Sequence, residues 1–349
     1  MRVRCIRTVL ACLILGLLIR IAAVASPREE YQVLKKITLG GEGGWDYLIV
    51  DSGAHRVYIS RSTRVMVVDL DTSTAVGEIP NTPGVHGIAL VPELGRGFTS
   101  NGREGTATIF DLKSLKSLGS VKTGDNPDAI IYDPASKRVF TFNGRSNDTT
   151  AIDAAAGTVA GSIPLGGRPE FATADGNGRI FVNLEDKSEV AVLDSQKLTL
   201  KTRWALAPCE EPSGMALDKQ HRRLFIGCRN KMMAVMDADN GKVITTLPIG
   251  TGVDANVFDP DTQLAFSSNG GDGTLTVVHE DSPDKFSVVQ NVETARGART
   301  MALDPKTHNI YLVTAQFGPP PAPTPEQPRP RPSIVPGSFE LLVVGGRKP

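Results

Sequence analysis

Residues 128–164 read DAIIYDPASKRVFTFNGRSNDTTAIDAAAGTVAGSIP. This stretch contains four short runs that are rich in apolar and β-branched residues, at 128–132, 138–142, 149–153 and 158–164. Turn-forming residues separate the runs, among them Asp133-Pro134 and Asn143-Gly144, and this composition is typical of strands and tight turns rather than of helices. The stretch therefore predicts four antiparallel strands.

The same order of runs recurs along the chain. One place in the second run of every unit carries an aromatic residue: Tyr58, Phe98, Phe140, Phe181, Phe225, Phe266 and Tyr311. Successive members of this series are 40 to 45 residues apart. A regular period of this length, with four strands per unit, is the signature of a β-propeller blade. We therefore predict an all-β fold, a seven-bladed β-propeller with four antiparallel strands per blade.

The last unit lacks a fourth run at its C-terminal side, because the chain ends soon after Val344-Gly345. Residues 33–39, near the N-terminus, read like the fourth runs of the other units. We expect this N-terminal strand to complete the last blade, since ring closure removes the exposed sheet edges that an open array would leave.

The first 25 residues have a different character. Arg2, Arg4 and Arg7 precede an apolar run at 8–19, and Ala23-Val24-Ala25 offers a cleavage site of small residues. This pattern predicts a secretory signal peptide at 1–25, followed by a single propeller domain at 26–349, with no membrane span after cleavage. We expect a monomer that is periplasmic or secreted.

Cleavage would remove four Arg and no acid, which changes the formal net charge from 0 to −4. A mildly acidic domain is a poor non-specific binder of nucleic acid.

The second runs share a tetrapeptide that ends in a polar residue: YISR at 58–61, FTSN at 98–101, FTFN at 140–143 and FSSN at 266–269. A turn related to I-D-x-x-T-G-K recurs at 152–157 and 236–242. These repeats resemble the YVTN-repeat β-propeller family, in particular its YncE-like periplasmic members. The resemblance implies a WD-repeat-like architecture and a periplasmic location, but no single reaction. Some YncE-like relatives are linked to DNA, so nucleic acid stays open as a partner through the resemblance alone.

Two cysteines lie beyond the leader, Cys209 and Cys228. Cys209 precedes the expected first strand of the fifth blade, and Cys228 ends the second strand of that blade. In an oxidising compartment this placement favours a disulfide over two separate thiols.

The innermost strands of a propeller line its channel, so the residues that begin them converge at one mouth. The candidate ligand-binding residues of this mouth are Trp45, Asp46, His86, Asp128, Glu170, Asp254 and Arg299. Loops between second and third strands add an outer ring of Arg61, Asn101, Asn143, Arg229 and Asn269. Convergent polar groups at a concave axis are the default binding-site hypothesis. The alternative is that these polar residues only hold water and cap turns.

His86 stands between two acidic members of the ring, Asp46 and Asp128. These carboxylates would raise the pKa of the imidazole and could share a cation with it, and such a ligand set suits a divalent ion. The ligand types favour a divalent cation, but no compact ligand spacing in the sequence supports one. The cation stays one interpretation of these residues, and no other cofactor is indicated. Trp45 could stack on a bound group or pack into the next blade. His279-Glu280-Asp281 is expected to form a solvated turn on the opposite face.

Catalytic motifs such as His-Glu-x-x-His and Gly-x-Ser-x-Gly are absent from the sequence. The hypothesis is therefore a binding or scaffold protein whose mouth takes a small molecule, a cation or a protein partner, and no catalytic residue is assigned. The alternative is a propeller hydrolase of lactonase type, with His86, Glu170 and Arg299 at the same mouth.

Residues 318–336 form an insertion with nine Pro that separates the second and third strands of the last blade. This composition favours polyproline II. Two interpretations stay open: an excursion without a partner, or a lid in which Arg329 and Arg331 face the acidic ring.

Overall fold

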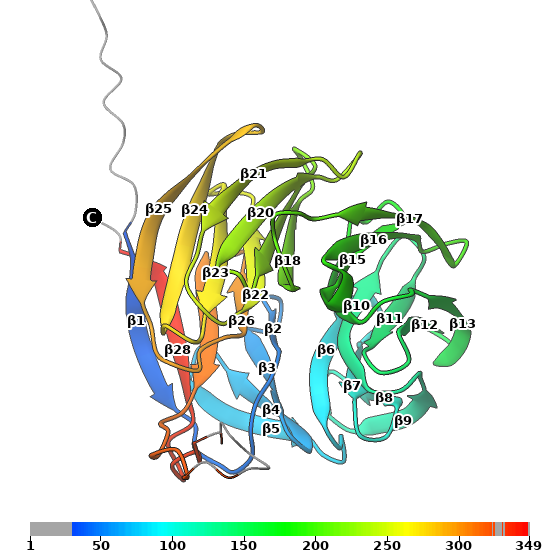
Figure 1. Ribbon diagram of the computed structural model, residues 1–349. Coiled ribbons are helices and arrows are strands. Elements are labelled where there is room, and N and C mark those ends of the chain that lie inside the picture. Colours follow the sequence, from blue (N-terminus) through cyan, green and yellow to red (C-terminus); the bar gives the residue numbers. More distant parts are fainter. Residues whose placement is uncertain (1–29, 323, 325–329, 331, 348–349) are drawn as a thin grey trace, which may run out of the picture.

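The computed structural model describes residues 30–322, 324, 330 and 332–347. Seven four-stranded antiparallel sheets are arranged as blades around a central axis (Figure 1). The only helical elements among these residues are two short 3-10 turns, Pro92–Leu94 and Glu185–Lys187. The all-β, seven-bladed fold is therefore confirmed. The signal peptide predicted at 1–25 lies outside the described residues. Within the described part of the chain, no helix is both long enough and apolar enough to cross a membrane.

The strands of each blade follow one another from the axis outward. Blade one contains β2 (Leu48–Asp51), β3 (Arg56–Arg61), β4 (Arg64–Asp69) and β5 (Thr74–Ile79). Blade two contains β6 (Val85–Val91), β7 (Arg96–Asn101), β8 (Thr106–Asp111) and β9 (Ser117–Lys122). Blade three contains β10 (Pro127–Asp133), β11 (Arg138–Asn143), β12 (Asp148–Asp153) and β13 (Thr158–Pro164). Blade four contains β14 (Pro169–Ala174), β15 (Arg179–Leu184), β16 (Glu189–Asp194) and β17 (Thr199–Ala205).

The remaining blades follow the same order. Blade five contains β18 (Pro212–Asp218), β19 (Arg223–Cys228), β20 (Met232–Asp237) and β21 (Val243–Pro248). Blade six contains β22 (Val253–Asp259), β23 (Leu264–Asn269), β24 (Thr274–Ser282) and β25 (Lys285–Glu293). Blade seven contains β26 (Met301–Asp304), β27 (Asn309–Thr314), β28 (Glu340–Gly346) and β1 (Tyr31–Thr38).

The N-terminal strand closes the ring. β1 pairs with β28 in antiparallel register, with Tyr31 opposite Gly346 and Thr38 opposite Glu340. The last sheet therefore has the order β1-β28-β27-β26, and β1 is its outer strand. This closure agrees with the sequence prediction, although the strand begins at Tyr31 rather than at Val33.

The periodic aromatic residues form the core between blades. All seven side chains are buried. Tyr58 of blade one, for example, packs against Phe110 of blade two with 6.0 Å between ring centroids. Burying one such side chain contributes about 1.5–3 kcal/mol, so the repeat places one anchor of this size in each blade.

Arginines at the start of several second strands tie each blade to the next. The guanidinium of Arg138 donates to the carbonyl of Ser195 at 2.8 Å, and that of Arg223 donates to the carbonyl of Pro283 at 2.6 Å. In each case the acceptor belongs to the turn between the third and fourth strands of the following blade. The same contact is made by Arg56, Arg96 and Arg179.

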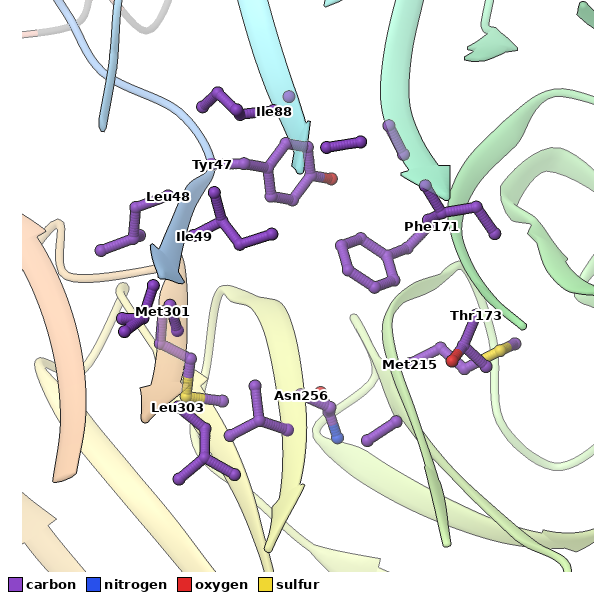
Figure 2. A pocket seen from close by; sticks show the side chains of 18 of the residues that line it. Tyr47, Leu48, Ile49, Ile88, Phe171, Thr173, Met215, Asn256, Met301 and Leu303 are labelled. Carbon is purple, nitrogen blue, oxygen red and sulfur yellow. The ribbon is translucent and has the colours of Figure 1, made fainter. Parts of the chain in front are cut away.

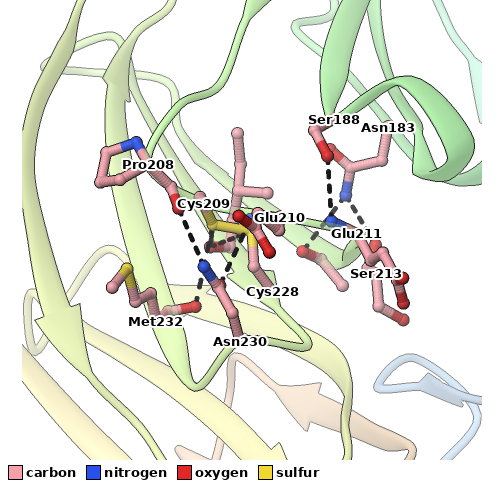
Figure 3. Close-up of a disulfide and its surroundings, with 12 residues drawn as sticks. Asn183, Ser188, Pro208, Cys209, Glu210, Glu211, Ser213, Cys228, Asn230 and Met232 are labelled. Carbon is pink, nitrogen blue, oxygen red and sulfur yellow. Dashed lines mark hydrogen bonds between the residues drawn. A yellow bond between two sulfur atoms is a disulfide. The ribbon is translucent and has the colours of Figure 1, made fainter.

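A disulfide joins Cys209 to Cys228, with Cα atoms 5.8 Å apart (Figure 3). Cys209 precedes β18, and Cys228 ends β19 opposite Pro212. The bond therefore closes the loop that leads into the innermost strand of blade five, as the sequence favoured. Asn230 supports this loop because its side-chain amide donates to the carbonyl of Pro208 at 2.8 Å.

One expectation was wrong. His279-Glu280-Asp281 is not a solvated turn, because β24 continues to Ser282 and the turn lies beyond it. Glu280 is 1% exposed. The hairpin of blade six is longer than the others, with nine residues in each strand, and the sequence pattern does not mark this extension.

Candidate functional site: a charged channel mouth

The residues that begin the innermost strands meet around the axis. The Nδ1 atom of His86 lies 2.6 Å from Oδ2 of Asp46 and 3.6 Å from Oδ1 of Asp128. These three side chains come from blades two, one and three, and each is partly buried. The imidazole of His86 packs closely against the backbone of Gly102. A Cβ atom on Gly102 would lie 2.7 Å from Nε2 of His86. A side chain at position 102 would therefore require the imidazole to move.

Arg299 bridges the other side of the ring. Its Nε atom lies 2.6 Å from Oδ2 of Asp254, and its Nη2 atom lies 3.1 Å from Oδ1 of Asp46. Nη2 also donates to the carbonyl of Trp45 at 3.2 Å. Ser213 donates its hydroxyl to Asp254 at 2.9 Å. One guanidinium therefore ties blade seven to blades one and six.

The mouth contains more acidic than basic side chains. Four carboxyl groups face one guanidinium and one imidazole, and the acids repel one another in a partly buried setting. Burial, together with the charges of Asp46 and Asp254, raises the pKa of Asp128 to about 7, although His86 and Arg299 oppose this shift. Burial, followed by the charges of Asp128 and Asp254, raises the pKa of Glu170 to about 9. Burial also raises the pKa of Asp254.

His86 responds in the opposite sense. Burial alone would lower the pKa of its imidazole, but the hydrogen bond to Asp46 and the charge of Asp128 outweigh that effect and raise it. The protonated ring is a cation that partly compensates these two acids. Asp46, His86 and Asp128 each present a ligand atom within 4.8 Å of the others, so a divalent cation could replace that proton.

Two aromatic rings lie directly below the charged ring. Tyr47 follows Asp46, Phe171 follows Glu170, and their ring centroids are 5.4 Å apart. Figure 2 shows the two side chains pointing toward each other across the channel. Burial, together with the charge of Glu170, raises the pKa of Tyr47 well above its usual range. The phenol is therefore neutral at physiological pH.

Below these rings the channel becomes apolar. A cavity of about 600 Å³ is lined by inner-strand side chains that include Ile49, Ile131 and Leu303. Its walls continue to Pro260 and Pro305, which follow the ends of β22 and β26. The axis is therefore divided into a charged mouth and an apolar chamber. Sequence reasoning missed this division, although an aromatic residue after a ring acid, as in Asp46-Tyr47 and Glu170-Phe171, could have signalled it.

Trp45 does not line the mouth with its ring. Its indole is 8% exposed and packs against Phe339 and Phe317, at centroid distances of 5.5 and 6.0 Å. The sequence left open whether Trp45 stacks on a bound group or packs into the next blade, and these contacts match packing.

The outer-ring residues divide into buried and exposed members. Asn101, Asn143 and Asn269 are buried, and each side-chain amide donates to threonine hydroxyls of the neighbouring strand. They bond within their own blades rather than face the solvent. Arg229 is the exposed member, and it lies 3.1 Å from Glu185 and 3.4 Å from Glu211.

Arg61, the remaining outer-ring residue, is completely buried. Its guanidinium lies 3.5 Å from the ring centroid of Phe339 and donates to the carbonyls of a loop at 40–44. Burial and the charge of Arg64 lower the pKa of this group to about 10, so it stays charged at neutral pH. The loop leads directly into Trp45 and Asp46. Arg61 is thus a positioning residue for the charged mouth.

The Pro-rich insertion begins beside the mouth. Phe317 and Ile334 form an isolated antiparallel bridge, and the amide of Gly318 donates to the carbonyl of Ser333 at 2.8 Å. These contacts form a short stem next to Trp45. Arg329 and Arg331, which the lid hypothesis invokes, lie outside the described residues.

Comparison with known proteins supports the fold. No family model and no curated protein matches this chain, so the likeness to YVTN-repeat propellers stays a prediction. Among solved structures, a chain of Kuenenia stuttgartiensis hydrazine synthase is similar with a TM-score of 0.70 and 15% identity, over 78% of this chain and 93% of that one. The WD40 repeats of RRP9 are similar with a TM-score of 0.73 and 9% identity, over 90% and 97%.

A chain of a mitotic checkpoint complex is similar as well, with a TM-score of 0.71 and 13% identity, over 89% of this chain and 96% of that one. At these identities the likeness establishes the architecture alone, a β-propeller with WD40 neighbours.

Proposed function

We propose that this protein is an exported binding propeller of the YVTN-repeat type, whose charged mouth takes up a cationic group. The observation that carries the proposal is the charge balance of the ring, in which Asp46, Asp128, Glu170 and Asp254 face Arg299 and His86. Such a ring lacks positive charge, and it holds protons on acids that are ionised in water. A bound cation would supply that charge in a site where water screens it poorly.

The ligand classes follow from the donors. Oxygen atoms from carboxylates and one imidazole nitrogen suit a divalent ion, and Asp46, His86 and Asp128 would hold it. The same oxygens suit the ammonium or guanidinium group of a small molecule or of a protein side chain. The structural neighbour from a mitotic checkpoint complex belongs to an assembly, which is consistent with a protein partner.

Isothermal titration calorimetry tests the proposal. The purified protein is titrated with Ca²⁺, argininamide and an oligolysine peptide, and we expect at least one of these three to bind with 1:1 stoichiometry. The double variant Asp128→Asn/Glu170→Gln should abolish that binding because it removes two carboxyl groups that would lose their protons to balance a bound cation. Asp125→Asn is the matched control, since Asp125 is an exposed carboxylate three residues from Asp128. Equal affinity in the double variant, or no binding of any of the three probes, would overturn the proposal.

The lactonase-type alternative has less support from the same contacts. Arg299 already donates to Asp254, Asp46 and the carbonyl of Trp45, so its guanidinium is engaged rather than directed at a substrate oxyanion. Glu170, with its pKa raised to about 9, would be protonated at neutral pH and could not act as a base. Turnover of a lactone panel that is lost in His86→Ala would favour the hydrolase instead.

A further inference from the structure

Two residues depart from the repeat at the seam between blades five and six. The third strands of successive blades carry an Asp or His toward their end, and the backbone amide of the next residue donates to a carbonyl in the turn between the first and second strands. The amide of Ala238 donates to the carbonyl of Arg222, and the amide of Glu280 donates to the carbonyl of Gln263. Elsewhere this position holds a small or apolar residue: Leu70, Leu112, Ala154, Ser195 and Ala238. Blade six alone among these places a carboxylate there.

The second departure is His221. It occupies a position in the turn after the first strand where Ser136 stands in blade three and Thr307 stands in blade seven. Ser136 and Thr307 donate their hydroxyls to the aspartate that ends the first strand of their own blade, at 2.7 and 2.8 Å. In blade five an imidazole replaces the hydroxyl, and its Nδ1 atom lies 2.8 Å from Oδ2 of Asp218.

These two departures meet. Nδ1 of His221 also lies 3.0 Å from Oε1 of Glu280, and the ligand atoms of Asp218, His221 and Glu280 all lie within 4.8 Å of one another. The side chains of Asp218 and Glu280 are 3% and 0% exposed, whereas that of His221 is 22% exposed. The cluster is therefore closed toward the protein, and the imidazole forms its solvent side.

Glu280 is not satisfied by this arrangement. Neither of its carboxylate oxygens has a hydrogen bond of good geometry among the described residues, although the side chain is fully buried. At the corresponding seam of blades three and four, the Ser195 hydroxyl donates to Asp133 at 2.5 Å. Ser195 thus presents a hydroxyl donor to the carboxylate of Asp133. At the seam of blades five and six, Glu280 stands in place of the serine, so its carboxylate faces the carboxylate of Asp218. Burying two acids side by side is unfavourable unless a cation lies between them, and the His221 imidazole is the one group placed to supply that charge among the described residues of the cluster.

We propose that Asp218, His221 and Glu280 form a divalent-cation site that joins blade five to blade six, separate from the charged mouth. One imidazole nitrogen and two carboxylates are a donor set for Zn²⁺ or Mn²⁺, with a position left for water on the His221 side. The ion would replace the single proton of the imidazole and bring two positive charges to two buried carboxylates. It also binds the long β24–β25 hairpin, which projects beyond the neighbouring strands (Figure 1), to the turn that follows β18.

The hairpin is already held at its tip. Arg223 of blade five donates to the carbonyl of Pro283 at 2.6 Å and lies 3.2 Å from Asp284. The three candidate ligands therefore sit on backbone that is positioned from both blades, and the site is preorganised for an ion.

The test uses the protein with its mouth neutralised by His86→Asn/Asp128→Asn, so that zinc at the mouth does not contribute. Metal analysis after equilibrium dialysis and the zinc-dependent shift of Tm are the two measurements. We expect one zinc ion per chain and a Tm that rises with zinc and falls with a chelator, because the ion binds only the folded state. His221→Ser/Glu280→Ala introduces the residues of the other blades, so it should fold, and it should weaken zinc binding by at least about 10-fold.

Two further variants make the outcome decisive. Glu280→Gln keeps the volume and should also lose the zinc-dependent shift. At the seam of blades six and seven, the imidazole of His308 lies 2.8 Å from Asp259, and His308→Ser should retain the shift. Zinc affinity and Tm shift that are unchanged in His221→Ser/Glu280→Ala would overturn the proposal. Absence of both zinc and Mn²⁺ binding in the mouth-neutralised protein would also overturn it, and would identify the cluster as a salt-bridged triad. Neither result depends on what the mouth binds.

Discussion

The imidazole of His86 lies 2.6 Å from the carboxylate of Asp46, although the two residues belong to different blades and are 40 positions apart in the chain. The same carboxylate accepts from Arg299 of blade seven through its other oxygen. Asp46 thus links both cations of the mouth. Because each link crosses a seam between blades, the arrangement exists only in the closed ring.

Replacing Glu170 with Gln should stabilise the protein at neutral and alkaline pH. The folded-state pKa of Glu170 is raised from 4.5 to about 9, so between these values the folded protein holds a proton that the unfolded chain releases. Stability therefore falls as pH rises through this window, and the penalty is absent below pH 4.5, where both states are protonated. Glu170→Gln removes the penalty, which reaches up to about 5 kcal/mol at pH 8 at about 1.36 kcal/mol per pKa unit.

Urea denaturation between pH 4 and pH 9 measures this effect, with the exposed Glu104→Gln as control. A pH slope that is identical in wild type and Glu170→Gln would contradict the electrostatic account of the mouth.

Gly102→Ala should displace His86 while leaving the fold intact. The added methyl would lie 2.7 Å from Nε2 and 2.9 Å from Cδ2 of the imidazole, so the ring must turn away from Asp46. We expect an NMR titration to show a lower His86 pKa in the variant, because the hydrogen bond that raises it is lost. A His86 titration curve that does not change would mean that the ring adapts without leaving Asp46.

Arg61→Lys should destabilise the protein strongly despite the conserved charge. An ammonium group cannot reproduce the planar fork that reaches the carbonyls at 40–44, and each hydrogen bond lost from this charged group costs about 1.5–3 kcal/mol. Arg64→Lys is the control, since Arg64 makes an exposed contact to Glu42 of the same loop. We expect the midpoint of chemical denaturation to fall for Arg61→Lys alone. Equal midpoints in the two variants would remove the positioning role of Arg61.

Removing the disulfide should lower stability without changing the fold. Cys209 and Cys228 are 19 positions apart, and a loop of this size contributes about 3 kcal/mol through the entropy of the unfolded chain. Cys209→Ala/Cys228→Ala should therefore lower Tm, and dithiothreitol should lower the Tm of the wild type but not that of the variant. The opposite pattern, with a reductant effect in the variant, would place the sensitivity elsewhere.

The periodic features of the fold were readable because they are local. Strand runs, Asp-Pro turns and one aromatic residue per unit recur every 40 to 45 residues, so each blade repeats the evidence of the last. The same regularity placed His86, Asp128 and Glu170 at equivalent positions and predicted that they would meet. Pattern reasoning failed where one blade departs from the pattern, as at Glu280, whose burial depends on a hairpin that is longer than its six neighbours.

The amino-acid sequence by itself determined the number of blades, the closing strand and the cysteine pair, because strand propensity, turn chemistry and spacing are properties of short segments read in order. Only the tertiary structure decided that the guanidinium of Arg61 packs on Phe339 while it holds the loop at 40–44. The same is true of the two ion pairs by which Arg299 bridges Asp46 and Asp254, and of the contact between Glu280 and Asp218. Hydrogen bonds and ion pairs form over about 3 Å. Partners that lie forty or more positions apart are therefore selected by how the blades pack, which no local pattern records.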